Sequence, residues 1–245
     1  MISLLSSLLG KLLYFVYHLL ASGIGQEPKS VSFYALSVIL TTIIFKLLLV
    51  PLTISQTKNQ ARMAQLQPEM KKIQKKYKND PTTLAQKQQA LYKEAGFNPL
   101  AGCLPLLIQF PILIAFLGIF KDPEKYAFTE PGFYQSMAKN FFYIQNLDHV
   151  DKTMILPILA AVTTFLVSYV MQKKQKEIGA GTNEQSDNMM KTMTYMMPLM
   201  ILFWGRQYAA GFVLYWTVSN LFSLVQQVLS NRSIVKAEHM GDESL

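Results

Sequence analysis

The chain has 245 residues, of which 51% are hydrophobic and only 16% are charged, and its formal net charge is +8. Soluble domains usually carry about 25% charged residues, so this composition argues against an ordinary soluble domain. Lys and Arg accumulate on the cytoplasmic side of membrane proteins, so the positive charge indicates topology, and no DNA partner is expected. Cys103 is the only cysteine, which excludes an intramolecular disulfide and a CxxC metal site.

Residues 1–30 precede the first long apolar run and carry an amphipathic pattern. At helical spacing, one stripe holds Ser7, Lys11, Tyr14, His18 and Ser22, and the opposite stripe holds Leu5, Leu8, Leu12, Val16 and Leu19. This pattern predicts an N-terminal helix that lies in the membrane interface. A signal anchor is the alternative, although the basic residue of a signal peptide normally precedes its apolar core.

Five apolar runs approach the roughly 20 residues that a helix needs to cross a bilayer core of about 30 Å. A spanning segment must satisfy its own backbone hydrogen bonds, so helices are expected. The predicted spans are residues 31–52, 99–120, 153–172, 193–206 and 209–228. The fourth is short, and the polar sequence Gly205-Arg206-Gln207 favours two helices joined by a tight turn. The sequence therefore predicts an all-α polytopic membrane protein.

The connecting segments differ in charge, and this difference predicts the orientation of the chain. Residues 53–98 carry nine basic and three acidic side chains, whereas residues 121–152 carry four lysines and five acidic side chains. The side that holds 53–98, the loop 173–192 and the tail 229–245 is therefore cytoplasmic. With five spans, the N-terminus is expected outside and the C-terminus in the cytoplasm.

The cytoplasmic segment 53–98 has a helical pattern of its own. Apolar residues recur at spacings of three and four at Met63, Leu66, Met70, Ile73 and Tyr77, and Leu84, Gln88, Leu91 and Ala95 repeat the spacing. Between the two sets, Asn79-Asp80-Pro81 is a turn signal. The pattern predicts a helical hairpin with a narrow apolar seam and a basic outer surface.

Lys46 is the most informative single residue because it lies inside the apolar run 43–51. A charge near the middle of a membrane costs about 2.5–3.5 kcal/mol on insertion scales, so it usually faces water or a polar interior. The alternative is that its amine reaches the cytoplasmic headgroups, since Pro51 is only about one helical turn away.

Other polar side chains recur in the predicted spans. They include Thr41, Thr42, Gln109, Ser168, Trp216 and Ser219. Each alone is more often a contact between helices, but their spread predicts a shared hydrated cavity around Lys46. The predicted spans contain no Asp or Glu, so an external anionic ligand is the expected partner of Lys46. No catalytic residue, metal site or cofactor is predicted.

Several segments of the chain carry specific motifs. The most specific is Asn98–Ile112, NPLAGCLPLLIQFPI. It is similar to the pattern NPLxGCxPxLxQxPI of the YidC family of membrane protein insertases, and two further segments also resemble this family. Lys46-Leu47-Leu48-Leu49-Val50-Pro51-Leu52 resembles its pattern of a basic residue followed by apolar residues and Pro-Leu, and Gly211–Asn220 with Gln226-Gln227 resembles its last span. The family usually has Arg where this chain has Lys46. The large extracytoplasmic domain of some relatives and a lipobox cysteine are lacking, so the short form is expected.

The resemblance implies a function that needs neither an enzymatic reaction nor a cofactor. Five helices would enclose a hydrophilic groove that opens to the cytoplasm and the lipid of the inner membrane and is closed on the outside. Lys46 would attract acidic residues in the tail of a nascent membrane protein. The expected partners are nascent membrane proteins, the ribosome and the lipid bilayer, and the chain would act alone or beside the general secretion channel.

Two rival classes are weaker on sequence grounds. An intramembrane protease needs a nucleophile and a base inside the spans, but His18, His149 and His239 all lie outside the five predicted spans. A channel or transporter would use Lys46 to bind a small anion, but no inverted repeat is seen in the sequence.

Overall fold

The computed structural model describes residues 2–96, 104–177 and 184–242, and helices dominate these ranges. The helices are α1 (Ile2–Ile24), α2 (Phe33–Lys76), α3 (Pro81–Glu94), α4 (Leu104–Lys121), α5 (Pro123–Tyr126), α6 (Phe133–Ser136), α7 (Ile155–Glu177), α8 (Glu184–Gly205) and α9 (Ala210–Asp242). Apart from isolated β-bridges around Phe141, no strand forms within these ranges. The all-α prediction is confirmed.

By length and composition, four of the described helical segments are suited to cross a membrane. They are Ile2–Ile24, Phe33–Gln56, Ile155–Lys173 and Ala210–Leu229, and two shorter apolar helices cover Ile108–Lys121 and Thr194–Gly205. The chain is therefore a polytopic membrane protein. Three of the four segments overlap predicted spans, and the two shorter helices overlap the other two. The segment Ile2–Ile24 is the helix that the sequence places in the membrane interface, and that position stays a prediction.

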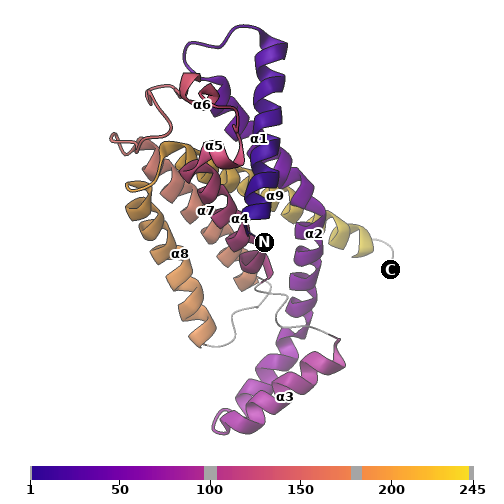
Figure 1. Ribbon diagram of the computed structural model, residues 1–245. Helices are drawn as coiled ribbons and strands as arrows, with labels where there is room; N and C mark the ends of the chain where they lie inside the picture. The colour runs from indigo at the N-terminus through magenta and orange to yellow at the C-terminus, as the bar shows by residue number, and fades with distance from the viewer. Residues whose placement is uncertain (1, 97–103, 178–183, 243–245) are drawn as a thin grey trace.

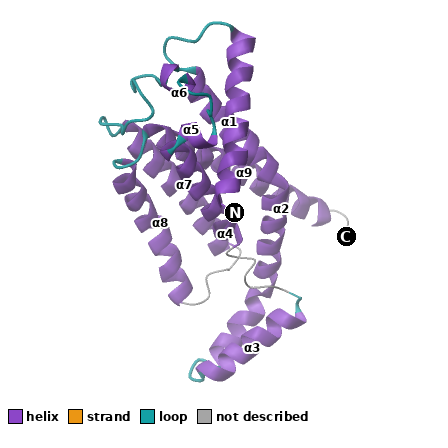
Figure 2. Cartoon of the chain, viewed as in Figure 1, coloured by secondary structure: helices purple, strands orange, loops and turns teal. Residues whose placement is uncertain are grey.

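The bundle has two distinct ends (Figure 1). Helix α9 is central, because it packs against α7, α2 and α4, while α8 packs on α7 and α1 packs on α2 and α4. The segment 122–152, here called the cap, carries α5 and α6 and lies at one end. The hairpin of α2 and α3 projects from the opposite end, with its turn at residues 77–80 (Figure 2). These are the cap end and the hairpin end of the molecule.

Local sequence explains where several helices begin. The side chain of Ser32 caps α2 by accepting a hydrogen bond from the backbone N–H of Ala35, and Asp80 caps α3 in the same way at Thr83. Asp and Ser are favoured at this position because they satisfy N–H groups that have no partner inside the helix. Helix α2 continues through Pro51 and Pro68, each of which removes one hydrogen bond from the helix ladder.

The cap holds the first turn of α9 with its own backbone. The N–H groups of Ala210 and Gly211 donate to the carbonyls of His149 and Leu147, each over 2.8 Å. Gly211 fits here because a Cβ atom would lie 2.7 Å from the ring of Phe120. The orphan N–H groups of the helix are thus satisfied by a loop rather than by a side-chain cap.

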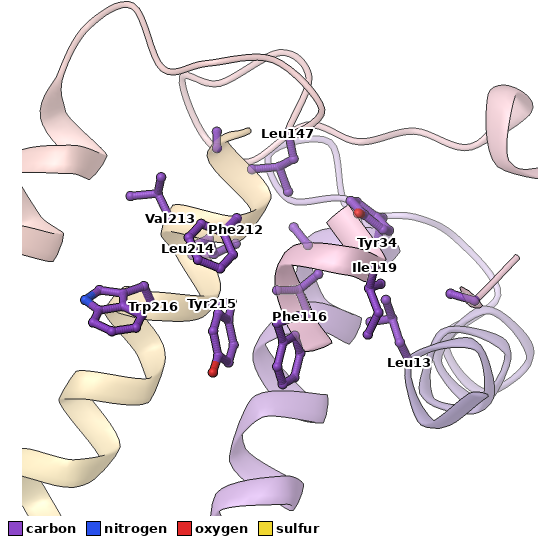
Figure 3. Close-up of a cluster of buried hydrophobic side chains, with 14 of the residues drawn as sticks. Leu13, Tyr34, Phe116, Ile119, Leu147, Phe212, Val213, Leu214, Tyr215 and Trp216 are labelled. Carbon is purple, nitrogen blue, oxygen red and sulfur yellow. The ribbon is translucent and has the colours of Figure 1, made fainter. Parts of the chain in front are cut away.

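The large buried side chains gather at the cap end. Figure 3 shows Tyr34, Phe116, Leu147 and Tyr215 together in this cluster, and the ring centroids of Phe116 and Tyr215 lie 3.9 Å apart. Stacked aromatic rings add to the stabilisation that their buried area provides. The cluster joins α1, α2, α4 and α9 to the cap.

Helix α1 is packed closely into this end of the bundle. A Cβ atom on Gly10 would lie 1.9 Å from the carbonyl oxygen of Tyr126, so only glycine fits there. The hydroxyl of Ser6 donates to the carbonyl of Ala115 over 3.1 Å. The buried face of α1 therefore runs between the polar stripe and the apolar stripe predicted from the sequence. Tyr14, which belongs to the polar stripe, donates a hydrogen bond to Glu130.

Candidate functional site

Lys46 lies on α2 where this helix packs against α9. Its side chain is half-buried, and its Nζ donates to the Oγ of Ser223 on α9 over 3.2 Å. Ser223 in turn donates to the carbonyl of Ser219 over 2.9 Å. Among the described residues, Lys139 and Asp148 form the ion pair, and Lys46 forms none. The hydrogen-bond partner of Lys46 is instead a neutral hydroxyl. The charge of Lys46 is therefore held but not neutralised.

Helix α9 presents two polar faces that hold its neighbours. Toward α2, Ser223 contacts Lys46, and Gln226 contacts Thr53 about one turn further along. Toward α7, the indole N–H of Trp216 donates to Thr164 over 3.0 Å. Asn220 donates to the same hydroxyl over 2.8 Å. Hydrogen bonds of this kind join helices where packing lacks a hydrophobic driving force.

The predicted site residues lie at different depths around Lys46. Thr41 and Thr42 are fully buried on α2 nearer the cap end, and Thr42 donates to the carbonyl of Val38 in its own helix. Gln109 is half-buried on α4 and lies beside the hydroxyl of Tyr215. The structure thus brings residues of α2 and α4 to the same side of α9.

Two further predicted site residues, Trp216 and Ser219, are buried on α9. Trp216 faces α7, whereas the backbone carbonyl of Ser219 accepts the hydrogen bond that the hydroxyl of Ser223 donates. Ser168 is half-buried on α7, one turn beyond Thr164, and stays outside the hydrogen-bond network of the described part of the chain. Two parts of the sequence prediction lie outside the described residues. They are motif residues 98–103 and residues 178–183 of the predicted cytoplasmic loop after α7.

Sequence reasoning missed Ser223, whose hydroxyl accepts a hydrogen bond from the amine of Lys46. The available signal was its spacing from Ser219 and Gln226, four and three positions away, which places all three on one face of a helix. That face can be recognised in the sequence, but the helix that it contacts cannot.

Several buried polar atoms have no hydrogen-bond partner within the described structure. They are the Oγ1 of Thr41, the Oη of Tyr215, the Nε2 of Gln172 and the Oε1 of Gln227, together with the Nε2 of His18 near the cap. Buried polar groups are almost always hydrogen-bonded, so such atoms mark places where water or a ligand completes the bonding. Three of the five, Thr41, Tyr215 and Gln227, lie on α2 and α9, the two helices that meet at Lys46.

The packing around Lys46 changes along the bundle. Toward the cap end, Val38 on α2 and Val213 on α9 are almost fully buried. Toward the hairpin end, Leu47 and Leu48 on α2 and Val225 on α9 expose more than half of their surface. Along α2 and α9, Lys46 therefore lies between a stretch with buried side chains and a stretch with strongly exposed apolar side chains.

The cap carries the densest polar network of the described chain. Lys139 pairs with Asp148 over 2.7 Å and lies 3.6 Å from the ring centre of Tyr134. Tyr134 donates to Asp148, and burial raises the pKa of Tyr134 far above its ordinary value, so the phenol stays protonated. Lys139 and Asp148 thus neutralise each other, whereas Lys46 contacts only the neutral hydroxyl of Ser223 among the described residues.

The described residues contain no cluster of three His, Cys, Asp or Glu side chains that is arranged to hold a metal ion. The groups that meet at Lys46 are a cation and neutral hydroxyl and carbonyl groups. Such groups bind anions and polar backbone.

Comparison with known proteins identifies the family of this chain. The model of the family described as 60Kd inner membrane protein matches residues 27–238. The chain is 40% identical over 194 residues to the membrane protein insertase YidC of Clostridium perfringens, covering 79% of this chain and 76% of that protein.

Two further relatives are similar over most of their length. The chain is 40% identical over 213 residues to membrane protein insertase YidC 1 of Streptococcus pyogenes serotype M6, covering 84% of this chain and 70% of that protein. It is 38% identical over 216 residues to membrane protein insertase YidC 2 of Bacillus anthracis, covering 86% of this chain and 77% of that protein. The chain therefore belongs to the YidC family of membrane protein insertases.

Proposed function

We propose that this protein inserts newly made membrane proteins into the inner membrane through a hydrated groove centred on Lys46. The observation that carries the proposal is the state of Lys46, which is half-buried between two helices and hydrogen-bonded to Ser223 without an ion-pair partner among the described residues. An unpaired charge in hydrocarbon is costly, so water or an anionic ligand must reach it.

The packing supports a groove that opens toward the hairpin end. Side chains on the cap side of Lys46 fill the space between helices, and the cap contributes the fully buried Leu147. On the hairpin side of Lys46, the described residues of α2 and α9 form no comparable core. Water would therefore enter from the hairpin end, which the charge distribution makes cytoplasmic, and the cap would close the outer side.

The charge of Lys46 would select the hydrophilic tail of a substrate. A carboxylate about 4 Å from an ammonium gains about 1 kcal/mol in bulk water and about 4 kcal/mol at an effective dielectric constant near 20. This attraction is enough to draw an acidic tail into a partly enclosed groove, and weak enough to release it. Lys gives a point charge without the planar fork of Arg, so the recognition would depend on charge more than on bidentate geometry.

The exposed apolar surfaces of α7 and α9 supply the path into lipid. Leu159, Val162 and Leu166 on α7 and Leu221 and Val225 on α9 are exposed. The helix of the substrate would leave the groove along this surface, and its transfer into lipid gains about 0.8 kcal/mol for each buried CH₂ group. No nucleotide is then needed, because apolar transfer drives the step.

The hairpin would be the receiving surface for the ribosome and its nascent chain. Lys71, Lys72, Lys75 and Lys76 lie exposed along the end of α2, and Lys78 lies exposed in the turn. A basic surface attracts anionic partners by steering that salt weakens. This proposal keeps the orientation expected from the charges, with the N-terminus outside and the C-terminus in the cytoplasm.

The test is to change Lys46 and to measure insertion of a single-span substrate whose tail carries acidic residues. Lys46→Arg should retain activity because it keeps the charge, whereas Lys46→Ala and Lys46→Glu should lose on the order of tenfold or more, as expected for about 1.4 kcal/mol or more of lost attraction. Lys29→Ala is the matched control, because Lys29 is exposed outside the predicted spans. Full activity of Lys46→Ala for every substrate tried would refute the proposal.

A further inference from the structure

Ser223 is arranged to accept a hydrogen bond from Lys46. A hydroxyl has one donor and two acceptor lone pairs, and the donor of Ser223 is engaged by the carbonyl of Ser219 over 2.9 Å. This bond fixes the rotation of the hydroxyl and leaves its lone pairs for the Nζ of Lys46, which lies 3.2 Å away. The contact joins residues 177 positions apart, so it depends on how α2 and α9 pack.

We propose that Ser223 is a positioning residue for substrate recognition, because it holds the ammonium of Lys46 inside the groove in a charged and accessible state. This inference rests on the proposed function of Lys46. It assigns to Ser223 the role of fixing where the positive charge lies, and it assigns the recognition of substrate carboxylates to Lys46 itself.

A lysine in this position needs such a contact. Its four-carbon side chain is flexible and carries about 2 kcal/mol of rotamer entropy. Without an anchor, the amine would extend along α2 toward the headgroups at the hairpin end, as long basic side chains near membrane surfaces do. Pro51 and the exposed Leu52 mark how near that surface is. A single hydrogen bond to Ser223 keeps the charge at the depth where α9 faces α2.

The neutrality of Ser223 matters as much as its position. A carboxylate at 223 would pair with Lys46 and cancel the charge that a substrate must meet. A hydroxyl instead uses one of the three N–H donors of the ammonium and leaves two donors for a second acceptor. The net positive charge therefore stays available to an acidic tail.

A second contact keeps the two helices in register at this site. Gln226, three positions after Ser223, donates to Thr53 of α2. Because Ser223 and Gln226 lie on the same face of α9, they hold α2 at two successive levels. The spacing between the Lys46 amine and Ser223 is thus set by helix packing as well as by the hydrogen bond.

The experiment compares Ser223→Ala and Ser223→Thr in the full-length protein reconstituted in liposomes. Two substrates are used, one with an acidic tail and one whose tail is neutral but otherwise identical. Ser37→Ala is the matched control, because Ser37 is a buried serine of α2 whose hydroxyl donates to the carbonyl of Tyr34 in its own helix. Protein level and resistance to protease are measured for each variant.

Ser223→Ala should lower insertion of the acidic-tail substrate about threefold to tenfold, the range expected for one hydrogen bond, and should change the neutral-tail substrate much less. Ser223→Thr keeps a hydroxyl and should restore insertion. In the Lys46→Ala background, Ser223→Ala should add nothing, because residues that act through one another are not additive.

Other results would overturn the inference. Equal losses for both substrates would show that Ser223 only supports the fold. Additive losses in the double variant would show that it does not act through Lys46, and an effect no larger than that of Ser37→Ala would show that it has no role in recognition. If Lys46→Ala itself inserts the acidic-tail substrate fully, the proposed function fails. If Lys46→Ala is impaired while Ser223→Ala is not, the positioning role alone fails.

Discussion

The cap end and the hairpin end of this bundle are built on opposite principles. At the cap end, Lys139 pairs with Asp148, aromatic rings stack, and the first turn of α9 is held by backbone contacts with the loop. Beyond Lys46, large apolar side chains of α2 and α9 such as Leu47, Leu48 and Val225 face outward. One half of the molecule is thus packed as a folded core, whereas α2 and α9 form no comparable core in the described part of the other half.

This difference teaches how a membrane protein can hold an unpaired charge. A rigid end fixes the positions of α2 and α9, so that the polar residues further along these helices need no dense packing of their own. Lys46 lies where the packing ends, and its contact with Ser223 is a hydrogen bond between helices that are already held together. In the proposed function, the site can admit water because the cap end supplies the stability.

Hydrogen exchange should show the largest difference between the two ends. We expect the amides of α3 to exchange on the order of a thousandfold faster than those of α7, because segments with little buried apolar surface open locally at little cost. In the hairpin, only Met70 and Leu91 are buried hydrophobic side chains among the described residues. Equal protection of 81–94 and 155–172 would show that the hairpin is docked on the membrane core.

Gly10→Ala should be the most damaging small substitution at the cap end. Its Cβ atom would lie 1.9 Å from the backbone oxygen of Tyr126, so α1 must move away from α5. Overpacking of this kind typically costs about 1–3 kcal/mol, and the upper value is expected because backbone atoms cannot rotate away. Thermal unfolding in detergent measures the loss.

The control for this prediction lies in the same helix. A Cβ atom on Gly23 would meet nothing within 4 Å, so Gly23→Ala should be neutral or stabilising by up to about 1 kcal/mol through helix propensity. Equal unfolding temperatures for both variants would contradict the close contact of Gly10 with the backbone of Tyr126.

Asp151→Asn should weaken the cap by about 2 kcal/mol at neutral pH, in the range for hydrogen bonds to a charged group. The carboxylate accepts hydrogen bonds from the N–H groups of Thr153 and Leu156 and from the hydroxyls of Thr153 and Tyr143. Burial alone would raise the pKa of Asp151, but these hydrogen bonds outweigh burial and lower the pKa below its ordinary value.

The pH dependence of this effect follows from the direction of the shift. A lowered pKa in the folded state means that the stabilisation is complete above the ordinary aspartate pKa of about 3.9 and is lost as the pH falls through the folded value. The difference in melting temperature between the wild type and Asp151→Asn should therefore shrink at low pH. Asp122→Asn is the control, because Asp122 is exposed and Asn caps a helix equally well. A difference that does not change with pH would contradict the role of the charge.

Cysteine labelling gives the smallest expected difference but tests the groove directly. After replacement of Cys103, a cysteine at 46 should react with a water-soluble maleimide from the cytoplasmic side about tenfold faster than one at Val38, which is almost fully buried about 12 Å nearer the cap. A cysteine at Leu47 is the sharper control, because Leu47 is adjacent and exposed, and it should face lipid.

Three outcomes would count against the groove. Equal reaction at 46 and 47 would mean that both are reached from the headgroup region. Equal reaction of position 46 from both sides of the membrane would indicate a through-channel and favour a transporter. The absence of reaction from either side would mean that Lys46 is packed dry between the helices.

The sequence by itself determined the class of this protein. Long apolar runs fix helices as the only way to satisfy the backbone in lipid, and the motifs around Lys46, Gln109 and Gly211 identify the family. The isolated charge in an apolar run was also visible, because its cost does not depend on which helix lies beside it. These conclusions rest on local properties of the chain.

Only the tertiary structure decided which residues act together. The contact of Lys46 with Ser223, the close approach of α1 to Tyr126 at Gly10, and the capping of α9 by the carbonyls of His149 and Leu147 all join residues far apart in sequence. Helical periodicity tells which side chains share a face, but it does not tell which helix that face meets. The partner is set by the packing of the whole bundle, where the large side chains at the cap end leave each helix one well-packed position.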